Sequence, residues 1–154
     1  MYSRRLLLAL PLIFAGPARA DHPDDLAHVL VICWAARGVR FTPEAVRERI
    51  GNARGRAALL AIAGATTNAD GDGEETAVEI VWEAGRNPLP TAPLLQHDLR
   101  RGLPLLLIDQ GGQPWVLHAL DEGTAHVTRA ARGERAALPL TSVALIARPV
   151  IAGA

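Results

Sequence analysis

The chain has 154 residues, of which 49% are hydrophobic, and its 16 basic residues balance its 16 acidic ones. This length and hydrophobic content suit a folded domain with a buried core and argue against disorder. The basic residues are all arginines scattered among acids, so the composition gives no sign of a nucleic-acid-binding surface.

The first 20 residues have the pattern of a secretory signal peptide. Arg4 and Arg5 precede an apolar run from Leu6 to Ala15, and the segment ends in Ala18-Arg19-Ala20, a small-x-small pattern. The run is too short to cross a bilayer as a helix, so we expect cleavage before Asp21 and no membrane anchor. The mature protein is therefore expected to be secreted or periplasmic and mildly acidic, with 13 basic residues left against 16 acidic ones.

Three helices are predicted after the signal peptide. The first covers Asp21 to Gly38, where acidic residues lead into an apolar stretch. The second covers residues 43–50, with Thr42 as its N-cap and a proline at its first position. A short third helix is expected from Arg56 to Ala63, followed by a surface loop from Gly64 to Gly73 that is rich in turn residues.

Two more helices are predicted in the middle of the chain. Over residues 74–85, Val78, Val81 and Trp82 share one stripe at helical spacing and glutamates occupy the other positions. A further helix is expected from Pro93 to Arg101, with a glycine directly after it.

After residue 103 the pattern changes from helical to extended. A short apolar strand is predicted at Leu105 to Ile108, and strands at Trp115 to Leu120 and Thr124 to Arg129 flank a turn, as in an antiparallel hairpin. A last strand is expected from Val143 to Val150. N-terminal helices followed by an antiparallel β-sheet are typical of an α+β fold, here in a single domain covering residues 21–154.

Cys33 is the only cysteine, so it cannot form a disulfide within the chain. A thiolate is the strongest nucleophile among protein side chains when a nearby imidazole or helix N-terminus lowers its pKa. The alternative is a small buried core residue, because Leu26, Val29, Leu30 and Cys33 share one helical face. Spacing alone leaves both interpretations open.

The arrangement resembles the bacterial papain-like cysteine peptidases, including the group related to the peptidase domains that process bacteriocins. The resemblance extends over most of the chain after residue 20. It is carried by Cys33 to Ala36, by Gly38 to Glu44 leading into a helix, by Leu99 to Pro104 before a strand, and by His118 on the next strand.

This resemblance implies a papain-like fold and a catalytic pair, with Cys33 as the nucleophile and His118 as the general base and acid. An imidazole suits that role because it can hold a thiolate as an ion pair and protonate the leaving amine near pH 7. The implied function is that of an exported cysteine peptidase, or a related acyl-transfer hydrolase, acting on a peptide or protein substrate. No cofactor or metal is implied.

A second hypothesis is a catalytically degenerate member that serves as a secreted binding or structural module. Ala27 stands where the family usually has a glutamine that stabilises the oxyanion. Arg129 to Arg132 stand where the residue that orients the histidine usually follows, and Glu134 is the nearest carboxylate.

A weaker third hypothesis is calcium-dependent binding. The residues Asn68, Asp70, Asp72, Gly73 and Glu79 fall at positions 1, 3, 5, 6 and 12 of an EF-hand loop. Position 1 is Asn instead of Asp, and no second loop is present to pair with it, so we expect no tight calcium binding and interpret the segment as a solvated acidic turn.

Overall fold

The computed structural model describes residues 15–85, 93–130 and 132–151, so most of the predicted signal peptide lies outside the described residues. The described chain forms four α-helices, seven strands and one 3-10 turn. The helices are α1 (Ala15–Ala36), α2 (Pro43–Ile50), α3 (Arg56–Ala61) and α4 (Pro93–Arg100). The strands are β2 (Gly64–Thr67), β3 (Gly73–Glu83), β4 (Leu105–Asp109), β5 (Pro114–Asp121), β6 (Thr124–Thr128), β7 (Arg135–Pro139) and β8 (Val143–Ile151), with the 3-10 turn η1 (Leu140–Ser142) before β8.

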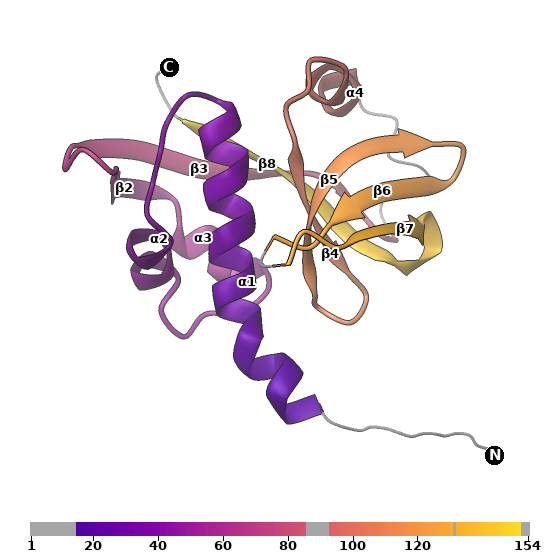
Figure 1. Cartoon of the computed structure of the whole chain (residues 1–154), viewed down its shortest axis with the longest axis horizontal. Coiled ribbons are helices and arrows are strands. Elements are labelled where there is room, and N and C mark those ends of the chain that lie inside the picture. The colour runs from indigo at the N-terminus through magenta and orange to yellow at the C-terminus, as the bar shows by residue number, and fades with distance from the viewer. Residues whose placement is uncertain (1–14, 86–92, 131, 152–154) are drawn as a thin grey trace.

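All seven strands join one antiparallel sheet in the order β2-β3-β8-β4-β5-β6-β7. The last strand, β8, lies inside the sheet between β3 and β4 and so ties the two halves of the chain together. In Figure 1, α1 runs across one face of the sheet, α2 and α3 lie beside it, and α4 lies at the end nearest β5. The predicted α+β class is confirmed at this level.

The helices with clear local start signals lie where the sequence predicts them. Helix α2 begins at Pro43, and the Thr42 hydroxyl caps it by accepting a hydrogen bond from the backbone N–H of Ala45 at 3.1 Å. Helices α1, α3 and α4 also overlap the predicted segments, as do β4, β5, β6 and β8. Local capping and periodicity were sufficient for these elements.

The helix predicted over residues 74–85 is wrong, because this segment is the strand β3. Val78 and Ile80 alternate with solvent-facing residues and pack on the core under α1. A β-bulge between Ile80 and Trp82 then moves Trp82 into the core on the opposite face. Because of the bulge, the adjacent residues Val81 and Trp82 both pack on this face. Their spacing from Val78 in the sequence is therefore that of an apolar helical stripe, although the segment is a strand.

The loop predicted from Gly64 to Gly73 is only partly correct, because β2 occupies its first residues and pairs with β3. Two buried hydroxyls support this pairing, since Thr66 and Thr76 lie 2.9 Å apart across the strands. The Thr76 hydroxyl also donates to the carbonyl oxygen of Ile62, at 2.8 Å. The remaining residues form the hairpin turn.

The sheet has a hydrophobic core on each face. Under α1, the core joins the helix to Leu106 and Ile108 of β4 and to Val116 of β5. On the opposite face, Leu95 of α4 packs with Leu107 and other sheet residues. The face of α1 predicted from spacing is buried, since Leu26, Val29, Leu30 and Cys33 are all core residues. Residues 26–34 of α1 are therefore held against the sheet.

Candidate functional site

Cys33 lies in the last turn of α1, and its side chain is completely buried in the core under the helix. Burial raises the pKa of the Cys33 thiol to about 12, and the nearby positive charge of Arg37 only partly opposes this effect. The C-terminal end of a helix also carries partial negative charge, which disfavours a thiolate. Cys33 is therefore a neutral thiol at physiological pH.

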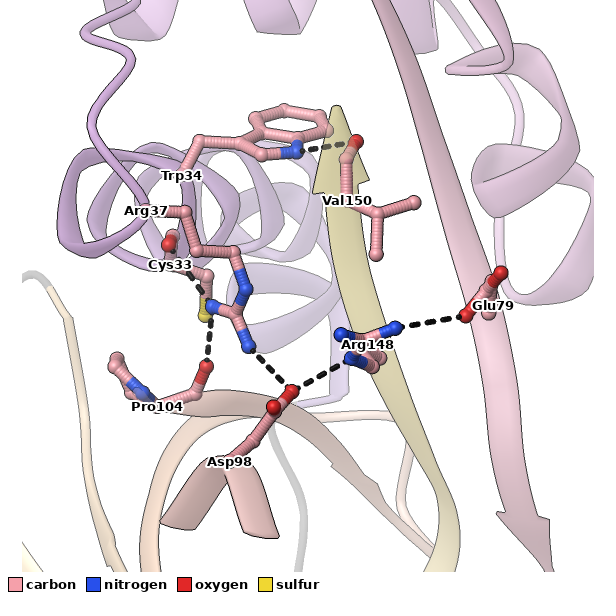
Figure 2. Close-up of polar contacts among 8 residues, drawn as sticks. All are labelled: Cys33, Trp34, Arg37, Glu79, Asp98, Pro104, Arg148 and Val150. Carbon is pink, nitrogen blue, oxygen red and sulfur yellow. Dashed lines mark hydrogen bonds and ion pairs between the residues drawn. The ribbon is translucent and has the colours of Figure 1, made fainter. Parts of the chain in front are cut away.

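A network of charged side chains surrounds the end of α1 that carries Cys33 (Figure 2). Arg37 donates to the carbonyl oxygens of Cys33 and Pro104, at 3.0 and 2.8 Å, and to Asp98 Oδ2 at 3.1 Å. The Asp98 carboxylate, only 2% exposed, also accepts from Arg148 Nε at 2.6 Å. This network connects α1 to α4, to the chain leading into β4, and to β8.

The outer part of the same network is more exposed. Arg148 reaches from β8 to Glu79 on β3, with 3.4 Å between Nη1 and Oε1, and the Glu79 side chain is 55% exposed. Beside it, the Trp34 indole N–H donates to the carbonyl oxygen of Val150 at 3.1 Å, as Figure 2 shows. The first contact links β8 to β3 and the second links α1 to the end of β8, so both are structural links.

His118 lies on β5, where a β-bulge between Leu117 and Ala119 leaves it without a strand partner. Its exposed ring forms a hydrogen bond between Nε2 and the hydroxyl of Thr128, at 2.9 Å. Burial and the positive charge of Arg135 lower the pKa of His118. The ring is therefore mainly neutral at pH 7.

The structure does not join Cys33 and His118 in a hydrogen bond. Thr128 is the hydrogen-bond partner of the imidazole, and Arg37 is the charged group that acts on the pKa of the thiol. The catalytic roles of Cys33 and His118 thus stay predictions, without the ion pair that such roles require.

A polar cluster that the sequence did not indicate connects α1 to β5 and β6. The Gln113 side chain donates to Asp25 Oδ2 at 3.0 Å, across 88 positions of sequence. Arg129 lies 3.6 Å from the same carboxylate oxygen and 3.7 Å from Glu134. The Arg129 guanidinium also stacks over Trp115, at 5.9 Å from the ring centroid. Only the fold brings these residues together.

This cluster occupies the region where the family resemblance requires the residue that orients the histidine. Arg129 stands there, and its partners are carboxylates instead of an imidazole. The start of β5 is fixed by Asp109, whose Oδ1 accepts from the backbone N–H groups of Gly111 and Gln113, both at 2.9 Å. An aspartate two residues before a glycine is a turn signal, and the sequence predicts a turn at Gln110 to Gly112, where the structure has it.

The other histidines considered from sequence are dispersed over the fold. His97 is exposed on α4, and His28 is half-buried on α1. His126 lies on β6, with its Nε2 3.2 Å from Asp121 Oδ2 at the hairpin end. The side chain of His22 lies outside the described residues.

The EF-hand-like residues do not converge on one point. The Asn68 side-chain oxygen accepts from the backbone N–H groups of Asp70 and Asp72, at 2.9 and 3.0 Å, and so closes the β2–β3 hairpin turn. Glu79 lies further along β3, beside Arg148. Over the described ranges, no cluster of three or more His, Cys, Asp or Glu side chains is suited to a metal ion.

A groove opens on the α1 side of the sheet, over the part of β5, β6 and β7 that the helix leaves uncovered. It has a volume of about 810 Å³. Ile32 of α1, which is 38% exposed, lines one wall, and His118, Thr128 and Arg135 of the sheet line the groove as well. The groove places His118 of β5 near Ile32 of α1.

Searches against family models, curated proteins and solved structures found no match for this chain. Among the helices of the described segments, none has the length and apolarity needed to cross a membrane.

Proposed function

We propose that this chain is an exported α+β module of papain-like type that binds a peptide or protein without cleaving it. The observation that carries the proposal is the environment of Cys33, which is completely buried at the C-terminal end of α1. With a thiol pKa of about 12, only about one molecule in 10⁵ would hold a thiolate at pH 7. A nucleophile at that level of ionisation could not sustain turnover.

The surroundings of His118 support the same proposal. A general base must lie within hydrogen-bond reach of the thiol, directly or through one water, and must be held by a third group. Here the imidazole is bound to Thr128, and Arg129 stands where an acid or amide is expected. This chemistry favours the degenerate relative over the active peptidase.

The burial of Cys33 also fits export. A single exposed thiol in an oxidising compartment would pair with other molecules, whereas a buried one is protected from exchange. The N-terminal 20 residues have the pattern of an export signal, and a secreted or periplasmic location is part of this proposal.

The proposal is tested by incubating the purified protein and its Cys33→Ala variant with a mixed peptide library between pH 5 and 8. Mass spectrometry of the peptides before and after incubation reads out cleavage. We expect identical peptide profiles for both proteins. Cleavage by the wild type that disappears in Cys33→Ala, and also in His118→Ala, would establish the peptidase and reject the binding module.

A further inference from the structure

We propose that the groove over β5, β6 and β7 binds a peptide carboxylate flanked by apolar side chains, with Arg135 as the main anchor for the negative charge. This inference rests on the proposed binding function and names the ligand chemistry of that site. It follows from the charge, the partners and the shape of the groove.

The groove carries positive charge without internal compensation. Its lining includes the guanidinium groups of Arg129 and Arg135, and no acidic residue of the described chain lines it. Arg129 is held by Asp25 and Glu134, which lie outside the lining. The site therefore attracts anions.

Arg135 is the arginine of the groove whose side chain has no partner among the described residues, so it can bind a ligand. Its side chain is exposed at the start of β7, and it forms no hydrogen bond or ion pair with any described residue. It lies directly opposite Thr128 in the β6–β7 register, and Thr128 is bound to His118. A row of polar side chains across three adjacent strands thus ends at Arg135, and an arginine fork matches the geometry of a carboxylate.

The groove also has apolar walls and is too large for a small ion alone. Ile32 faces it from α1, Ala137 contributes a small side chain from β7, and Ala130 lies in the loop between β6 and β7. A volume of about 810 Å³ is of the size that encloses several amino-acid side chains. A carboxylate with apolar neighbours therefore fits better than a free anion.

The edge strand favours a peptide over other carboxylates. Among the described strands, β7 is at the edge of the sheet and pairs only with β6, so the backbone groups on its outer side have no described strand partner. An extended peptide can satisfy such groups while its side chains enter the adjacent groove. A small organic acid has no extended backbone with which to pair these groups.

The probe is an N-acetylated octapeptide of alanine and leucine with a free C-terminal carboxylate. Its amidated form is the uncharged control, and an amidated form with one central glutamate tests a side-chain carboxylate. Binding to the full mature protein is measured by NMR titration, and the pKa of His118 is followed in the same samples. A carboxylate near the imidazole should raise the pKa of His118, because it offsets the charge of Arg135.

We expect a peptide with a carboxylate to bind about ten-fold or more tightly than the amidated one, and Arg135→Gln to remove that difference. Arg132→Gln is the matched control, since Arg132 is exposed nearby, lies outside the lining and carries the same charge. Only the comparison of these two variants separates a local contact from a general charge effect.

Equal affinities for the three peptides, equal effects of the two variants, or acetate binding as tight as the peptide would each overturn the proposal. Failure of the proposed function is recognised separately, since mass spectrometry of the same samples would then find the peptides cleaved in a Cys33-dependent way. Binding without cleavage, lost in Arg135→Gln only, supports both.

Discussion

The two regions that carry the predicted catalytic residues differ in how their charges are satisfied. Around Cys33, the Asp98 carboxylate is 2% exposed and binds Arg37 and Arg148. Around His118, Arg135 is exposed and has no partner among the described residues. A buried network with every charge paired stabilises the fold, whereas an open groove with an unpaired cation is available to a ligand.

The largest effect is expected in the buried network. Asp98→Ala leaves Arg37 and Arg148 without their shared carboxylate and should lower the free energy of unfolding by about 3–5 kcal/mol. Glu79→Ala removes an exposed partner of Arg148 and should cost less than about 1 kcal/mol. Urea denaturation of both variants measures the difference, and equal losses would show that burial of the network has been overestimated.

The next effect is a loss of stability at alkaline pH caused by Cys33. The unfolded thiol ionises above about pH 8.5, whereas the native thiol keeps its proton until about pH 12. Stability from this group is therefore complete well below pH 8.5 and should fall by about 2 kcal/mol between pH 8.5 and 10.5.

Few other side chains of the mature protein ionise in this pH range, so the contribution of Cys33 can be measured with little interference. The chain contains no lysine, and its single tyrosine, Tyr2, lies in the predicted signal peptide. Cys33→Ala should therefore flatten the alkaline limb of the stability curve in the mature protein. A curve that keeps the same slope in this variant would mean that Cys33 is not the titrating group.

The smallest effect is expected in the groove. His118→Ala and Arg135→Gln remove exposed groups that contribute little to the core, so each should change the free energy of unfolding by less than about 0.5 kcal/mol. Thermal unfolding of the two variants checks this expectation. A loss comparable with that of Asp98→Ala would show that the groove is part of the structural framework.

Much of the fold could be predicted because its signals are local. Helix α2 is signalled by the Thr42 cap and the proline directly after it. The buried face of α1 is signalled by apolar residues at helical spacing between Leu26 and Cys33. The hairpin of β5 and β6 was equally clear, since Asp121 to Gly123 mark a turn between two alternating runs.

The errors arose where the backbone departs from a regular period. The bulge at Val81 made β3 look helical, and β7 was missed because its residues Arg135 to Pro139 are short, alanine-rich and end in proline. No sequence pattern predicts the interactions between distant segments. Asp25 and Gln113 meet only because α1 lies across the start of β5.

The positions of Cys33 and His118 in the fold could be predicted from sequence, but their environments could not. His118 lies on β5 as expected, yet the bulge and Thr128 determine its surroundings. Helical spacing placed Cys33 on the core face correctly, and the depth of its burial depended on how the sheet packs against α1. Burial, more than residue type, determines whether a thiol can react.

The most direct test of a structural Cys33 is its rate of alkylation by iodoacetamide between pH 5 and 10. We expect slow labelling of the native protein across this range, no change in His118→Ala, and fast labelling after unfolding in urea, because the thiol is buried and its pKa is raised to about 12. Rapid labelling near pH 6 that is lost in His118→Ala would contradict this account and restore the catalytic pair.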